Sequence, residues 1–98
     1  MAYTVTTTIT KPENISWWGA QHPNAAARYG QAVTSHPGVA AMTNVAVTNT
    51  TWTTNIVCAN SAVWASLVSS MRTNSDAALR HQYIENNKLP VTMVFTHS

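Results

Sequence analysis

The chain has 98 residues, of which 45% are hydrophobic and only 8% are charged, against about 25% charged residues in an average soluble domain. This composition excludes a disordered chain, which combines low hydrophobicity with high charge. The length corresponds to one domain, residues 1–98, with room for a single core. No apolar run approaches the roughly 20 residues of a membrane-spanning helix, so we expect no membrane partner.

The formal net charge is +2, from five basic and three acidic residues. The basic residues are scattered along the chain, whereas nucleic-acid-binding proteins usually cluster them, so we expect no nucleic-acid partner. The single cysteine, Cys58, excludes an internal disulfide and a cysteine-based metal site. Because no basic and apolar leader follows Met1, we expect a cytoplasmic protein, or one carried in a virion, that is not secreted.

The first third of the chain predicts a strand, a loop and a helix. Residues 3–10 alternate between β-branched or aromatic side chains and threonine, which indicates a strand. Pro12 ends it, because proline cannot donate to the sheet ladder. Residues 15–22 are expected to form a loop, and the Ala-rich residues 24–35 to form a helix with one apolar face.

The remainder predicts a hairpin, a broken helix and a final strand. Residues 39–48 and 51–59 alternate again across a short turn, which indicates a β-hairpin. Apolar residues at helical spacing predict helices over 61–72 and 75–87, and residues 91–97 predict the last strand. This order is that of the α+β, ferredoxin-like βαββαβ fold, with both helical crossovers on one face of a four-stranded antiparallel sheet.

Two further features accompany this layout: Trp64 in the second crossover, and the stretch Leu79-Arg80-His81-Gln82-Tyr83 ahead of a short closing strand. With them the chain resembles the dimeric α+β barrel superfamily, whose best-known group is the antibiotic-biosynthesis monooxygenase-like proteins. The resemblance covers nearly the whole chain and is one of layout. It implies that two sheets pair face to face and that cofactor-independent monooxygenase activity occurs among relatives.

One branch of that superfamily degrades haem with an Asn, a Trp and a His. Trp64 and His81 could supply two of these, but they lie 17 residues apart and the first strand carries threonine where the Asn belongs. Haem degradation is therefore not expected. The low charge and the abundance of Thr, Ala and Asn also look like the composition of many small phage-encoded proteins.

Catalytic and metal-binding patterns are missing from the sequence. The carboxylates are far apart in sequence, whereas paired-carboxylate hydrolysis needs them about 5–10 Å apart. No two histidines have the i, i+4 spacing that places both on one helix face. Cys58 alternates with other apolar strand residues, which favours a core position over a nucleophile. We therefore predict no catalytic residue, no metal and no cofactor, and lean toward a protein that is not an enzyme. The carboxylates are Glu13, Asp76 and Glu85, and the histidines are His22, His36, His81 and His97.

The adjacent residues Trp17 and Trp18 are the strongest signal for a binding site. Neighbouring aromatics in a loop cannot both point into one core, so at least one covers the end of the sheet, lines a pocket or meets a partner. A pocket between sheet and helices could take a small apolar ligand. Its candidate residues are Trp17, Trp18, His22, Trp52 and His81.

The sheet face opposite the helices is predicted to carry no charge. An exposed sheet face normally bears Lys and Glu, which deter edge pairing, so an uncharged face favours burial against a second sheet. We expect a homodimer or higher homo-oligomer that buries this face. Its candidate residues are Thr4, Thr6, Thr8, Met42, Asn44, Asn55 and Val94.

The sequence leaves two classes of function open. The first is a small non-enzymatic, self-associating module, such as a phage accessory or virion-associated protein. The alternative is a cofactor-independent monooxygenase-like enzyme, or a binder of small apolar ligands, that uses the pocket between sheet and helices.

Overall fold

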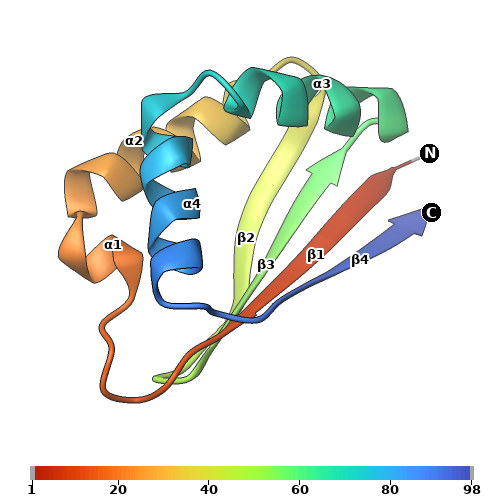
Figure 1. Ribbon diagram of the computed structural model, residues 1–98. Helices are drawn as coiled ribbons and strands as arrows, with labels where there is room; N and C mark the ends of the chain where they lie inside the picture. The colour runs from red at the N-terminus through yellow and green to blue at the C-terminus, as the bar shows by residue number, and fades with distance from the viewer. Residues whose placement is uncertain (1, 98) are drawn as a thin grey trace.

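Four segments rich in β-branched residues form the strands of the computed structural model, which describes residues 2–97. The Ala-rich segment and the apolar-striped segments form the helices between them (Figure 1). The elements in chain order are β1 (Tyr3–Thr10), α1 (Trp18–Gln21), α2 (Pro23–Thr34), β2 (Val39–Val47), β3 (Thr51–Cys58), α3 (Ser61–Met71), α4 (Ser75–Asn86) and β4 (Val91–His97).

The strands form one antiparallel sheet in the order β2-β3-β1-β4. Figure 1 shows α2, α3 and α4 on the same face of this sheet, with the other face bare. This arrangement confirms the predicted α+β, ferredoxin-like βαββαβ fold. The ends of the predicted strands, and of the three longer helices, lie within one residue of the observed ends.

Local residue chemistry fixes where the helices begin. Pro23 occupies the first turn of α2, where a missing N–H costs nothing. The side chain of Asn60 accepts a hydrogen bond from the backbone N–H of Val63 at 3.0 Å and caps α3. Asn74 caps α4 in the same way, accepting from the N–H groups of the second and third residues after it.

The segment predicted as a loop over residues 15–22 contains a short helix, α1. The N–H groups of Ala20 and Gln21 both donate to the carbonyl oxygen of Trp17, at 3.0 and 3.2 Å. The N–H of His22 donates to Trp18 O at 2.8 Å, which closes the turn. As a result the two adjacent tryptophans leave the backbone in different directions, and Trp18 is buried.

The predicted open-face positions in β2 were wrong for Met42 and Asn44, which lie on the helix-facing side. The pairing of β2 with β3 shifts between Val39 and Ala41 and again between Asn44 and Ala46. Each such irregularity changes which residues share a face, so counting by twos along the sequence assigns the wrong side. Ala41, Thr43 and Ala46 take the open-face positions instead, opposite Val57, Asn55 and Thr53 of β3.

The core lies between the sheet and the helices in two clusters. One is built on Val33, Ile56, Cys58 and Leu67, all nearly inaccessible to solvent. The other contains Ile9, Trp18, Ala25, Tyr83 and Leu89, and sits where α1, α2 and the end of α4 meet β1. Between and beside these clusters the helices do not fill the space over the sheet.

The α2 and α4 helices are joined by a two-bond ion pair. Arg28 donates from Nε to Asp76 Oδ2 at 3.1 Å and from its second guanidinium nitrogen to Oδ1 at 3.0 Å. Asp76 is largely buried in the first turn of α4, where a negative charge is favourable. This carboxylate is therefore used to hold two helices together.

Candidate ligand-binding cavity

A cavity of about 810 Å³ separates the helix-facing side of the sheet from α1, α2 and α4. Its size falls within the range of about 300–1,000 Å³ that small-molecule sites occupy. The sheet contributes lining side chains from all four strands. On the β4 edge of the sheet, the lining residues are the apolar Val91 and Met93. Both are more than 40% exposed although they face the helical side, because no helix covers this edge of the sheet.

Aromatic rings form the walls of this cavity. Trp17 and Trp52 meet edge to face, with ring centroids 5.4 Å apart and an interplanar angle of 73°. Trp18 meets Tyr29 in the same way at 6.1 Å and 89°. Trp64 also lines the cavity. Large, flat and weakly polar walls of this kind suit a flat aromatic ligand.

The position of Trp17 is fixed from outside the cavity. Its indole N–H donates to the carbonyl oxygen of Thr48 at 2.7 Å. The ammonium group of Lys11 lies 4.9 Å from the centre of its ring, within the range of a cation–π contact. Lys11 is only 5% exposed, and its amine donates to the carbonyl oxygens of Asn49 and Pro12. The charge of this lysine therefore stabilises the turn that contains Asn49 and the position of the Trp17 ring.

Polar groups on the sheet side of the cavity form a closed triangle. The Trp52 indole N–H lies 3.0 Å from Thr54 Oγ1 and 3.2 Å from Asn44 Oδ1. Thr54 Oγ1 in turn donates to Asn44 Oδ1 at 3.2 Å. All three residues line the cavity, so its apolar wall contains one localised polar patch.

Three ionisable side chains stand on the α4 side of the cavity. Arg80 places its guanidinium 5.2 Å from the centre of the Tyr29 ring. His81 Nε2 lies 3.1 Å from Glu85 Oε1, with both side chains about 70% exposed (73% and 67%). Since the carboxylate accepts only, Nε2 carries the proton in this contact, and a neutral ring would have Nδ1 as its acceptor. An exposed imidazole thus lines the α4 side of the cavity.

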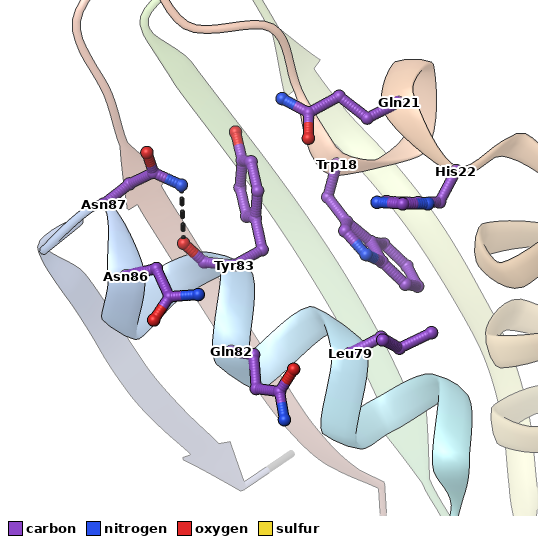
Figure 2. Close-up of a pocket in the computed structure, with 8 residues that line it drawn as sticks. All are labelled: Trp18, Gln21, His22, Leu79, Gln82, Tyr83, Asn86 and Asn87. Carbon is purple, nitrogen blue, oxygen red and sulfur yellow. Dashed lines mark hydrogen bonds between the residues drawn. The ribbon is translucent and has the colours of Figure 1, made fainter.

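A second, smaller pocket of about 200 Å³ lies on the other side of Trp18. Figure 2 shows its lining, with the Trp18 ring between His22 and α4 and the amide groups of Asn86 and Asn87 at one end. Asn87 donates from its side-chain amide to the carbonyl oxygen of Tyr83 at 2.8 Å. Among the buried side-chain N and O atoms of residues 2–97, Trp18 Nε1 is the one with no hydrogen-bond partner.

The structure brings four of the five predicted pocket residues together and separates the fifth. Trp17, Trp18, Trp52 and His81 line the large cavity. His22 lines the small pocket instead, because the turn that ends α1 directs it to the far side of Trp18. The structure gives the positions of these five residues. That they bind a ligand remains a prediction.

Several cavity residues carried no site signal in the sequence. Asn44 was assigned to the opposite face, and Tyr29 and Met93 lie in segments predicted only as a helix and a strand. A direct signal existed for Trp17 and Trp18, because adjacent aromatics in a loop cannot both point into one core.

Cys58 lies in the core at 0% exposure, and burial raises the pKa of its thiol. The thiolate that would act as a nucleophile is therefore disfavoured. We expect Cys58 in the native protein to react with an aromatic disulfide reagent at pH 8 at least about a hundredfold more slowly than in guanidinium. Stopped-flow absorbance would measure both rates, and equal rates would contradict the buried position.

Within residues 2–97 no group of three or more His, Cys, Asp or Glu side chains is arranged to hold a metal ion. In the same part of the chain, none of the helices has both the length and the apolar character required to cross a bilayer.

Comparison with known proteins gives likenesses of fold. No protein-family model matches the sequence, and no curated protein matches it. Among solved structures, a mutant of SnoaB, a cofactor-independent oxygenase from Streptomyces nogalater, superposes with a TM-score of 0.70 at 9% identity, covering 99% of this chain and 92% of SnoaB. A provisionally assigned antibiotic biosynthesis monooxygenase from Deinococcus radiodurans gives 0.64 at 8% identity over 100% and 92% of the two chains.

A third structure, a dabb family protein with a ferredoxin-like fold from Mesorhizobium loti, gives a TM-score of 0.53 at 6% identity over 98% of this chain and 97% of that one. At such identities the likeness concerns the fold. The layout resemblance that the sequence predicted is confirmed at that level: this chain has the fold of the antibiotic-biosynthesis monooxygenase-like, dimeric α+β barrel proteins.

Proposed function

We propose that the protein binds a flat, mostly apolar aromatic molecule in the cavity between its sheet and its helices. The observation that carries this proposal is the 810 Å³ cavity itself, which is lined by four tryptophans and two tyrosines and left open beside β4. Open cavities of this size with mostly apolar and aromatic linings are typical of small-molecule binding sites. The alternative class of function is therefore favoured over the non-enzymatic module, and nothing in the fold likenesses supports a phage or virion role.

Oxygenation is the second part of this proposal, supported by the likeness to SnoaB and by His81. A substrate with an activated ring CH₂ group between aromatic rings can lose a proton and reduce dioxygen without a cofactor. The CH₂ group becomes a carbonyl, one oxygen atom enters it, and the other leaves as water with the two hydrogens. His81, with Nδ1 free and Nε2 held by Glu85, is the group that would accept the first proton.

Binding can be tested with fluorene, a flat three-ring hydrocarbon, by equilibrium dialysis with protein in excess. We expect a dissociation constant below about 100 μM, in line with the free energy that a ligand of this size can gain. Gly30 on α2 lines the cavity, and no atom lies within 4 Å of where its Cβ would be. Gly30→Phe should therefore place a ring in the cavity and weaken fluorene binding at least about tenfold.

Gly30→Ala is the matched control, because it adds one methyl group at the same position and should leave the affinity within about twofold. Absence of saturable binding to the native protein would overturn the binding proposal. Equal affinity in Gly30→Phe would mean that the ligand binds elsewhere.

Oxygenation can be tested with an oxygen electrode and anthrone as substrate. We expect oxygen uptake that His81→Ala abolishes, and no enzyme-dependent oxygen uptake would contradict oxygenation.

We further propose that the protein is a homodimer that buries the open face of the sheet. This open face consists of the residues that point away from the helices, and it carries no charge; they are Thr4, Thr6, Thr8, Thr10, Ala41, Thr43, Ala46, Thr51, Thr53, Asn55, Val57, Thr92, Val94 and Thr96.

Polar groups on the open face already bind each other. Thr6 Oγ1 donates to Asn55 Oδ1 at 2.6 Å across the β1–β3 pair. The hydroxyl oxygens of Thr8 and Thr53 lie 3.2 Å apart in the next register position. Because these hydrogen bonds lie within the sheet, a second sheet can cover these four side chains without breaking the bonds between them. The face-to-face pairing implied by the family resemblance is thus compatible with its chemistry.

A further inference from the structure

We propose that Asn44 is the residue that selects the ligand, by donating a hydrogen bond from its side-chain amide to an oxygen atom on the aromatic molecule. The inference rests on the proposed binding function of the cavity and specifies its chemistry. The expected ligand class is an aromatic ketone, quinone or phenolate, as opposed to a plain hydrocarbon.

The orientation of the Asn44 amide is fixed by its two neighbours. An indole nitrogen can only donate, so the Asn44 atom 3.2 Å from Trp52 Nε1 must be the oxygen. The Thr54 hydroxyl accepts from the same indole N–H at 3.0 Å, which leaves its own proton for Asn44 Oδ1 at 3.2 Å. With both donors directed at Oδ1, the amide cannot flip without placing two N–H groups against two donors.

The amide nitrogen of Asn44 is left free by this arrangement. Among residues 2–97 it has no hydrogen-bond partner, although Asn44 lines the cavity. Its two N–H groups are therefore available to a molecule inside the cavity. The irregular pairing of β2 around Asn44 and Ala46 is what brings this residue to the helix-facing side.

The surroundings make this donor selective. Met42 and Ile56 line the cavity beside the triangle, and the ring of Trp52 forms part of it. Asn44 is exposed to the open cavity until a ligand covers it. A donor covered by a hydrocarbon then loses its water without compensation, whereas one covered by a ligand oxygen forms a hydrogen bond among apolar groups that is stronger than in water. The pocket should therefore accept flat hydrocarbons and prefer those that place an oxygen atom at Asn44.

Fluorenone and fluorene test this inference, because the two molecules share one ring system and differ by a carbonyl oxygen. We expect Asn44→Leu and Asn44→Asp each to reduce the preference of the native protein for fluorenone about three- to tenfold, as measured by equilibrium dialysis of both probes. Asn44→Asp keeps the oxygen that accepts from Trp52 and Thr54 and replaces the amide donor with a second, negatively charged acceptor. A purely structural role of Asn44 would leave that variant unchanged.

The matched controls are Asn24→Leu and Asn24→Asp on the exposed start of α2, outside the cavity, which should retain the native preference. If the native protein binds neither probe, the proposed binding function fails. If it binds both and the preference persists in both Asn44 variants, the function stands and the role of Asn44 is overturned. Far-UV circular dichroism identifies a variant that does not fold. If one Asn44 variant fails to fold, the ligand preference of the other Asn44 variant tests the role of Asn44.

Discussion

A lysine in place of Thr6 should convert the protein from a dimer into a monomer. Thr6 lies on β1, in the middle of the uncharged open face, and is half-buried in the single chain. In a dimer with two-fold symmetry the substitution enters the same interface twice. An unpaired charge buried in this way costs about 3–5 kcal/mol, so the dissociation constant should rise at least about a hundredfold.

Light scattering at tens of micromolar measures this change directly. The native protein should have a mass of twice 10.6 kDa, and Thr6→Lys a mass of 10.6 kDa. Asn55→Lys, at the cross-strand partner of Thr6, should act in the same direction. Ser69→Lys on the exposed side of α3 is the control and should remain dimeric. A native mass of 10.6 kDa would reject the dimer. If both Thr6→Lys and Asn55→Lys remained dimeric, the open face would not be the dimer interface.

The fold could be predicted because its signals are local. Alternation in residues 3–10, and the β-branched and aromatic residues of 91–97, identify each strand without reference to its neighbours. Asn60 and Asn74 mark the starts of α3 and α4 by hydrogen bonds that span only two or three residues. Such signals fix the order of the elements, and that order already determines the sheet topology.

The site was only partly predictable because its chemistry depends on distant partners. Asn44 faces the cavity owing to the irregular pairing of β2 with β3, which no alternation within β2 reveals. Lys11 is buried because the turn between β2 and β3 brings the carbonyl of Asn49 to its amine. The tryptophans were recognisable, since rings of their size need a wall or an interface wherever the chain places them.

The same substitution at two glycines should have opposite effects on stability, and Gly38→Ala should have the larger one. Gly38 precedes β2 with a φ of +89°, a conformation that costs other residues about 1–2 kcal/mol. An added Cβ would lie 2.5 Å from Val63 Cγ2 and 3.0 Å from Val63 Cγ1. Overpacking of this kind costs about 1–3 kcal/mol more, so we expect a loss of about 2–5 kcal/mol.

Thermal unfolding followed by circular dichroism should show a fall in Tm of at least about 8 °C for Gly38→Ala, given about 4–8 °C per kcal/mol for a domain of this size. Gly30→Ala, in the middle of α2 with open space around the added methyl, should instead raise the free energy of unfolding by about 0.5–1 kcal/mol.

Val63→Ala removes the clash and leaves the backbone strain at Gly38. Adding it to Gly38→Ala should therefore cost less than the sum of the two single changes, because the steric part of the penalty disappears. Strict additivity would assign the whole penalty to the backbone, and an unchanged Tm in Gly38→Ala would contradict the close approach of α3 to this turn.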